Sequence, residues 1–176
     1  MKTNQVTKIV LTALFAAMAF VATYIIRVPT VGTNGYVNIG DTIVLLSAWM
    51  IGGVYGGLAA GIGSALSDFS AGYGMYVPGT FVIKFLMAVA AYVVFNSLRK
   101  ANVHKIIGYA ISGVLAEVIM VLGYFLYEST LLGYGLGAVF SVASNLIQAG
   151  ICLVLGYILI GILEGAKVTV LIRKYV

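Results

Sequence analysis

The sequence predicts an all-α, polytopic membrane protein. Of its 176 residues 62% are hydrophobic and only 9% are charged, whereas about a quarter of the residues in a soluble domain are charged. Most charges fall between apolar runs that approach or exceed the ~20 residues a helix needs to cross ~30 Å of hydrocarbon. An outer-membrane barrel is excluded, because runs such as 43–51 and 85–95 are apolar on every face instead of alternating in polarity.

Six transmembrane helices are expected, at residues 6–26, 41–51, 54–69, 78–98, 106–127 and 137–163. The first apolar run continues without a break to Ile26, longer than the core of a signal peptide, so a retained helix is expected. The second and third helices are short and are joined by the tight turn Gly52-Gly53. Residues 1–176 are therefore expected to form a single six-helix transmembrane domain.

The basic residues predict the orientation. Eight of the ten Lys and Arg residues lie before the first helix, between the fourth and fifth, or after the sixth: Lys2, Lys8, Arg99, Lys100, Lys105, Lys167, Arg173 and Lys174. Because Lys and Arg concentrate in cytoplasmic loops, both termini are expected to be cytoplasmic. The net charge of +5 does not indicate nucleic acid binding, since these residues flank membrane segments and form no stripe on a polar domain.

Small residues predict where helices meet. In lipid, close helix packing relies on Gly and Ala, and the third helix repeats them every fourth position at Gly53, Gly57, Gly61 and Ala65. This helix is expected to be buried among its neighbours. Ala13 and Ala17 share one face of the first helix, either for packing inside the chain or for docking a second membrane protein. We expect the first helix to contribute no residue to a polar pocket.

Four polar side chains are expected at a common depth. At ~1.5 Å per residue, Lys84, Glu117, Asn145 and Gln148 lie about 9 to 16 Å below the outer ends of their helices. Ionisable side chains in a membrane usually face the interior of a helix bundle, so a polar cavity between the last three helices is expected. The alternative is a structural salt bridge between Lys84 and Glu117, with Asn145 and Gln148 joining helices by hydrogen bonds.

Signatures of catalysis are missing from the sequence. There is no G-x-x-x-x-G-K-[ST] phosphate loop and no nucleophile elbow. His104 is the only histidine, which argues against a histidine metal site, and Cys152 is the only cysteine, so no intrachain disulfide can form. The chain is therefore expected to be no enzyme and to bind no cofactor. If it takes part in uphill transport, the energy is expected to come from a source outside this chain.

Several segments together resemble a known family. They are the A-x-x-x-A spacing of Ala13 to Ala17, the run Asn38-Ile39-Gly40-Asp41, and the stretches 67–73 and 76–84. With six helices in a short chain, they resemble the substrate-binding S components of energy-coupling factor (ECF) vitamin transporters. The resemblance implies a multi-pass protein of the bacterial cell membrane. It also implies a transmembrane coupling subunit that contacts Ala13 and Ala17, and two cytoplasmic ATPase subunits that use ATP.

The resemblance also implies a vitamin site near the outer surface, formed by the first outer loop and the later helices. The residues assigned to this site are Asn38, Asp68, Tyr73, Tyr76, Lys84, Glu117, Tyr124, Asn145 and Gln148. The motifs look most like the branch that handles pyridoxine or hydroxymethylpyrimidine, with riboflavin and pantothenate left open. One alternative is an autonomous secondary transporter or channel with Lys84 and Glu117 as an ion relay, and another is a membrane adaptor that binds no ligand.

Overall fold

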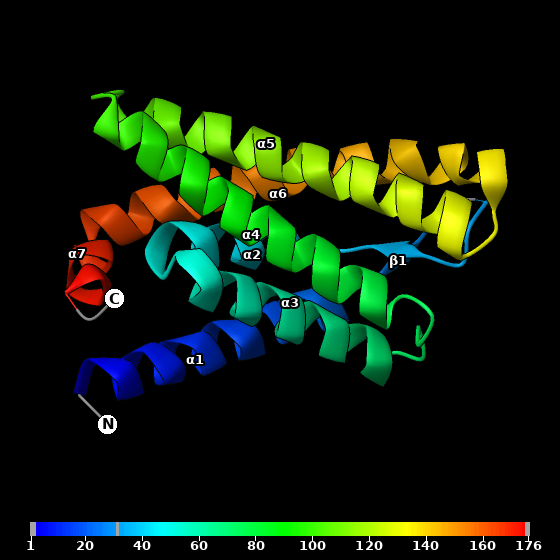
Figure 1. The fold of residues 1–176 in the computed structure, drawn as a ribbon, viewed down its shortest axis with the longest axis horizontal. Helices are drawn as coiled ribbons and strands as arrows, with labels where there is room; N and C mark the ends of the chain where they lie inside the picture. Colours follow the sequence, from blue (N-terminus) through cyan, green and yellow to red (C-terminus); the bar gives the residue numbers. More distant parts are fainter. Residues whose placement is uncertain (1–2, 31, 175–176) are drawn as a thin grey trace.

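The computed structural model describes residues 3–30 and 32–174, so Lys2 lies outside the described residues. The α-helices are α1 (Thr3–Ile25), α2 (Gly40–Met50), α3 (Gly53–Ser70), α4 (Val77–Lys100), α5 (Lys105–Leu126), α6 (Val139–Gly165) and α7 (Val168–Arg173) (Figure 1). The first six confirm the helices predicted from the apolar runs to within a few residues. The short α7 was not predicted.

Short elements join the helices at one end of the bundle. Strands β1 (Val28–Pro29) and β2 (Tyr36–Val37) pair antiparallel between α1 and α2. A π-helix at Tyr127–Leu131 continues α5, and a 3-10 helix at Gly135–Ala138 leads into α6. These elements and the α3–α4 connection lie at the end of the molecule opposite to α7 and the start of α1 (Figure 1).

Four segments of the described chain are long and apolar enough to cross a membrane: Gln5–Ile25, Val77–Lys100, Lys105–Leu131 and Gly135–Gly165. The protein is therefore an all-helical membrane protein. Helix α2 has only 11 residues, which at ~1.5 Å per residue span about half of the hydrocarbon layer. The six crossings and the cytoplasmic termini predicted from the sequence remain predictions.

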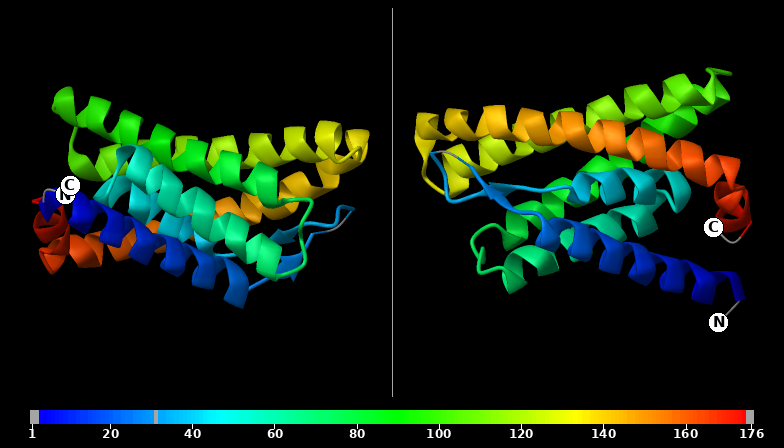
Figure 2. Two further views of the ribbon diagram at one scale, coloured as in Figure 1. Left: turned by 60° about the horizontal axis from the view of Figure 1, so that its bottom comes forward. Right: turned by 180° about the vertical axis from the view of Figure 1, so that it is seen from behind.

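Helix α2 forms the centre of the fold, and all 11 of its residues are buried. It lies between α3 and α4 on one side and α6 on the other (Figure 2). Near its C-terminal end, Trp49 donates a hydrogen bond from Nε1 to Ser112 Oγ at 3.0 Å and packs its ring against Tyr109. A mostly apolar helix that is buried around its whole circumference belongs in the core, and α2 carries Asp41 in its first turn.

The small residues of α3 allow close contact with both neighbouring helices, as predicted. A Cβ added at Gly63 would lie 2.3 Å from the backbone oxygen of Ala16 in α1. A Cβ added at Gly61 would lie 2.9 Å from the backbone oxygen of Phe81 in α4. In contrast, Ala13 and Ala17 of α1 are exposed, so they do not pack within the chain.

The α1–α3 contact gives a direct test of this packing. Gly63→Ala would force α1 and α3 apart, because the backbone carbonyl of Ala16 cannot rotate away as a side chain can. Overpacking of this kind costs about 1–3 kcal/mol, and we expect a lower melting temperature in detergent. Gly150→Ala in α6 is the matched control, since nothing lies within 4 Å of its added Cβ. Equal melting temperatures for the two variants would show that α1 and α3 are not in close contact.

Candidate functional site

A cavity lies at the end of the bundle that carries the two strands. Its lining residues come from α1, the β1–β2 hairpin, α3 to α6 and the π-helix: Thr23, Thr30, Gly35, Tyr36, Asn38, Asp68, Tyr76, Thr80, Lys84, Tyr124, Glu128, Asn145 and Gln148. The space free for a water-sized molecule is about 20 Å³, which is room for roughly one water. An organic ligand therefore needs part of the lining to move outward.

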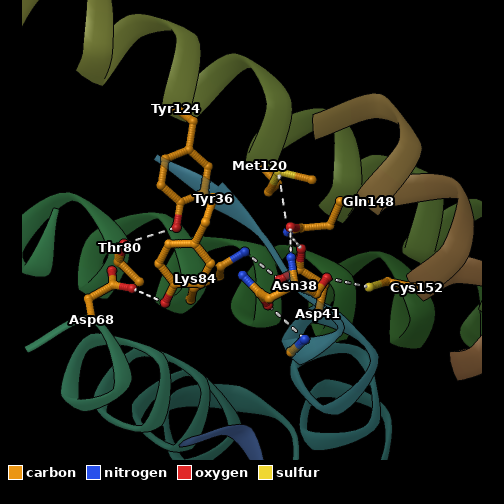
Figure 3. Close-up of polar contacts among 11 residues, drawn as sticks. Tyr36, Asn38, Asp41, Asp68, Thr80, Lys84, Met120, Tyr124, Gln148 and Cys152 are labelled. Carbon is orange, nitrogen blue, oxygen red and sulfur yellow. Dashed lines mark hydrogen bonds and ion pairs between the residues drawn. The ribbon is translucent and has the colours of Figure 1, made fainter. Parts of the chain in front are cut away.

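The floor of the cavity is a buried ion pair between Lys84 of α4 and Asp41 of α2. Lys84 Nζ donates to Asp41 Oδ1, and Gln148 Nε2 of α6 donates to Asp41 Oδ2 at 2.5 Å (Figure 3). Gln148 Oε1 in turn accepts from the backbone N–H of Asn38 at 2.6 Å. The side chains of Lys84 and Asp41 are 1% and 0% exposed. These contacts join α2, α4, α6 and the loop before α2 into one polar cluster.

The ion pair in the floor is not the Lys84–Glu117 salt bridge that was considered as an alternative from the sequence. Lys84 pairs with Asp41, and no salt bridge joins Lys84 to Glu117 within the described residues. The reason is that α2 inserts between α4 and α6, which brings the first turn of α2 against Lys84. Glu117 is 2% exposed, and neither of its carboxylate oxygens has a hydrogen-bond partner in the described structure. It is close enough to Asp41 and Lys84 to interact with both electrostatically, but it is not among the cavity-lining residues.

Above the floor, tyrosines from two elements face buried polar groups. The Tyr36 hydroxyl of β2 donates to Asp68 Oδ1 at 2.5 Å, and Tyr124 Oη lies 2.9 Å from Thr80 Oγ1. Burial and the neighbouring Asp68 carboxylate raise the pKa of Tyr36 above its ordinary value, so this hydroxyl stays protonated and acts as a donor. Lys84 Nζ lies 5.2 Å from the centroid of the Tyr124 ring. The cavity therefore has aromatic walls with polar ends.

The rim of the cavity next to the hairpin is organised by Glu128 in the π-helix. Its carboxylate accepts from the hydroxyl of Tyr76 at 3.0 Å and from the hydroxyl of Ser141. Burial and the Glu128 carboxylate raise the pKa of Tyr76, so Tyr76 is also a protonated donor. A Cβ added at Gly35 would lie 3.2 Å from both Glu128 Oε1 and Tyr76 Oη. The β1–β2 hairpin therefore rests directly on this pair.

Most of the residues assigned from the sequence come together here. Seven of them line the cavity: Asn38, Asp68, Tyr76, Lys84, Tyr124, Asn145 and Gln148. Among the described residues no group hydrogen-bonds to the side-chain amide of Asn145, which faces the cavity from α6. Tyr73 does not line the cavity but packs its ring at a tilt of 52° against Tyr36, with ring centroids 4.6 Å apart. Lys84 of α4 and both Asn145 and Gln148 of α6 line the same cavity, but Glu117, the α5 residue expected at their level, does not, and α5 contributes Tyr124 instead.

Three residues were missed. Thr23 of α1 lines the cavity, and its buried hydroxyl has no partner in the described structure, so the expectation that α1 contributes no pocket residue was wrong. The outer end of α1 contacts the start of α2, where a Cβ at Gly40 would lie 2.1 Å from Thr23 Oγ1. Neither Asp41 nor Glu128 is among the site residues predicted from the sequence. The sequence feature that could have indicated Asp41 is its position directly before a long apolar run. Glu128 has no such feature, because its burial depends on the π-helix Tyr127–Leu131, which no sequence pattern predicted.

Comparison with known proteins connects this geometry to a family. The family model described as "ECF-type riboflavin transporter, S component" matches residues 3–165. The chain belongs to this S component family. A protein of Pyrococcus woesei described as "Uncharacterized protein in gap 3'region" is 38% identical over 136 residues, which cover 77% of this chain and 87% of that protein.

Membership in the S component family confirms the family predicted from the sequence. ECF S components are transport subunits and not enzymes, and they work with a module of membrane and ATPase subunits that uses the ATP. The cavity found here then lies in a transport subunit, and its polar floor is a candidate for substrate binding. The family match does not distinguish a pyridoxine or hydroxymethylpyrimidine branch.

The ion pair of the floor generates a prediction. Lys84→Met or Asp41→Asn alone leaves a buried group without its partner, which costs about 3–5 kcal/mol. Each single variant is therefore expected to have a clearly lower melting temperature than the unmodified chain. The double variant Lys84→Met/Asp41→Asn should recover most of that loss, because no unpaired charge remains.

Differential scanning fluorimetry of the unmodified chain, both singles and the double measures this coupling. As a control, Lys84→Met/Glu117→Gln should recover no more than the Glu117→Gln substitution gains on its own, since Glu117 does not hold the ammonium group. Recovery in the control pair and none in the Asp41 pair would contradict the arrangement of the floor.

Proposed function

We propose that this chain is the high-affinity substrate-binding subunit of an ATP-driven ECF importer for a small water-soluble vitamin or vitamin precursor, located in the cell membrane. The observation that carries the proposal is a buried polar cavity at the end of a membrane bundle that belongs to the S component family. Basic residues such as Arg99, Lys100 and Lys105 lie at the other end. By the positive-inside rule, the cavity faces the outside, where a vitamin is captured.

The nine residues assigned from the sequence are proposed to form the binding site. Lys84 and Gln148 supply donors on the floor, and Asn145 supplies an amide that no group in the described part of the chain already engages. Tyr76 and Tyr124 offer ring faces on which a flat heterocycle can stack. Asp68 and Asn38 hold the loop and α3 around the ligand, and Tyr73 supports Tyr36 from behind. Glu117 is proposed to contact the ligand once the ion pair of the floor has loosened.

For the substrate, pyridoxine or hydroxymethylpyrimidine remains our proposal. Its support is the small free volume of the cavity, which a single six-membered ring can enter with less rearrangement than a three-ring flavin. Riboflavin is the second candidate, because the description of the matching family model names it. Binding isotherms of the purified chain with these compounds decide between them.

The proposed docking face for the coupling subunit is an apolar groove between α1 and α3. Ala13, Ala16 and Ala17 line it from α1, and Tyr55, Leu58 and Ile62 from α3. Exposed small residues allow a partner helix to approach closely in lipid. ECF S components act together with a membrane subunit, and this subunit is the partner proposed to bind in the groove. The ion-relay alternative is less supported, because Asp41 and the ring of Tyr124 already engage the Lys84 ammonium.

The assembly is tested by co-purification from the native membrane. A tagged chain is expected to bring down one membrane coupling subunit and two ATPase subunits. Recovery of the chain alone, from membranes in which those subunits are expressed, would favour an autonomous transporter or adaptor.

A substitution on the groove tests where the coupling subunit docks. Ala13→Trp or Ala17→Trp should abolish transport and co-purification while leaving ligand affinity of the isolated chain unchanged, because both residues are exposed and lie outside the cavity. Leu14→Trp is the control, as Leu14 is 53% exposed on α1 but does not line the groove. Equal loss of transport in the control, or loss of ligand binding in the alanine variants, would argue against the docking face.

Glu117 generates a further prediction. A buried carboxyl without hydrogen-bond partners costs stability, so Glu117→Met is expected to raise the melting temperature of the ligand-free chain. The same variant should weaken ligand binding by roughly tenfold or more, since a charge-assisted contact to the ligand is lost. A higher melting temperature with unchanged affinity would remove Glu117 from the site.

A further inference from the structure

The cavity region contains more buried acidic than basic side chains. In the described structure Asp41, Asp68, Glu117 and Glu128 are buried carboxyl groups, and Lys84 is the one buried basic side chain. In a membrane each buried charge needs a partner or a proton. One ammonium group cannot neutralise four carboxyl groups, so the remaining carboxyl groups either hold a proton or need a positive group from a ligand.

The single ammonium group is already committed. Lys84 forms its ion pair with Asp41, and the other ion pair of the described residues joins Lys105 to Glu164 at the opposite end of the bundle. Asp68 and Glu128, which line the cavity directly, are left with neutral donors. These are the hydroxyl of Tyr36 for Asp68 and the hydroxyls of Tyr76 and Ser141 for Glu128.

The tyrosine rings that line the cavity together with Asp68 and Glu128 are suited to binding a cation. Tyr36, Tyr76 and Tyr124 line the cavity, and in Figure 3 the rings of Tyr36 and Tyr124 lie beside the Lys84 side chain. Lys84 Nζ is within 5.2 Å of the Tyr124 ring centroid, which shows that a positive group can lie near this ring. Tyrosine faces attract cations within about 6 Å, and more strongly when water is excluded.

We propose that the ligand of this chain carries a positive charge or an amino group directed at Glu128 and Asp68, which places it among cationic or amino-substituted heteroaromatic compounds. Carboxylates and phosphate esters are rejected by the same two acidic side chains, because a like charge brought into a buried site costs several kcal/mol. The inference rests on the proposed function, since it assumes that the cavity is the substrate site. This preference for a positively charged or amino-bearing ligand, called the charge rule below, does not follow from membership in the family.

Matched pairs of compounds test the rule on the purified full-length chain. The first pair is 4-amino-5-hydroxymethyl-2-methylpyrimidine and its 4-hydroxy analogue, and the second is pyridoxamine and pyridoxal. Each amino compound is also compared with its phosphate ester, and riboflavin and pantothenate represent neutral and anionic vitamins. Isothermal titration calorimetry is expected to show the amino member of a pair binding roughly tenfold tighter or more, and the phosphate esters not binding.

Variants locate the preference. Glu128→Gln keeps an acceptor for the Tyr76 hydroxyl but removes the charge, so it should reduce the amino preference to less than about threefold. Asp68→Asn provides a second variant should Glu128→Gln fail to fold, and Glu164→Gln at the other end of the bundle is the control with unchanged preference. Equal affinities within each pair, or tightest binding of riboflavin or pantothenate, would overturn the charge rule but leave the proposed function intact. Pyridoxine, the proposed substrate without an amino substituent, completes the panel, and binding of no compound in it would overturn both.

Discussion

The ion pair between Asp41 and Lys84 is the interaction on which the rest of the structure depends. Lipid offers no water to solvate either group, so each must find its partner inside the bundle. Asp41 can reach Lys84 only when the short helix α2 lies between α4 and α6, and Gln148 then closes the cluster through the second carboxylate oxygen. This requirement places a fully buried 11-residue helix at the centre of the fold.

The same cluster divides the molecule into two functional ends. On its hairpin side lie the tyrosines, the hairpin and the acidic rim around Glu128, which together form a cavity with about 20 Å³ of space for a water-sized molecule. On the opposite side, Trp49 and the packed rings around it fill the core. Within residues 3–30 and 32–174, neither the hydroxyl of Thr23 nor the side-chain amide of Asn145 has a hydrogen-bond partner, so neither contributes to stability in this way. Unsatisfied polar groups in an otherwise well-packed protein are typical of a binding site.

Much of this could be predicted from the sequence. The apolar runs predicted the six main helices, because a membrane helix must be apolar along its length. The common depth of Lys84, Glu117, Asn145 and Gln148 predicted a shared cavity, and all of these except Glu117 line it. The partner of Lys84 could not be predicted, since it depends on how α2 inserts between its neighbours. Glu128 was missed because its burial follows from a π-helix, and Thr23 because its orientation depends on the contact of α1 with Gly40.

The central claim is that substrate binds between the Asp41–Lys84–Gln148 floor and the Glu128 rim. A structure of the chain purified with its natural ligand tests it most directly. We expect the ligand ring beside Tyr76 and Tyr124, its amino or cationic group within hydrogen-bond distance of Glu128 or Asp68, and the hairpin displaced outward to make room. A ligand bound in the α1–α3 groove, or an unchanged cavity with the ligand elsewhere, would contradict the claim.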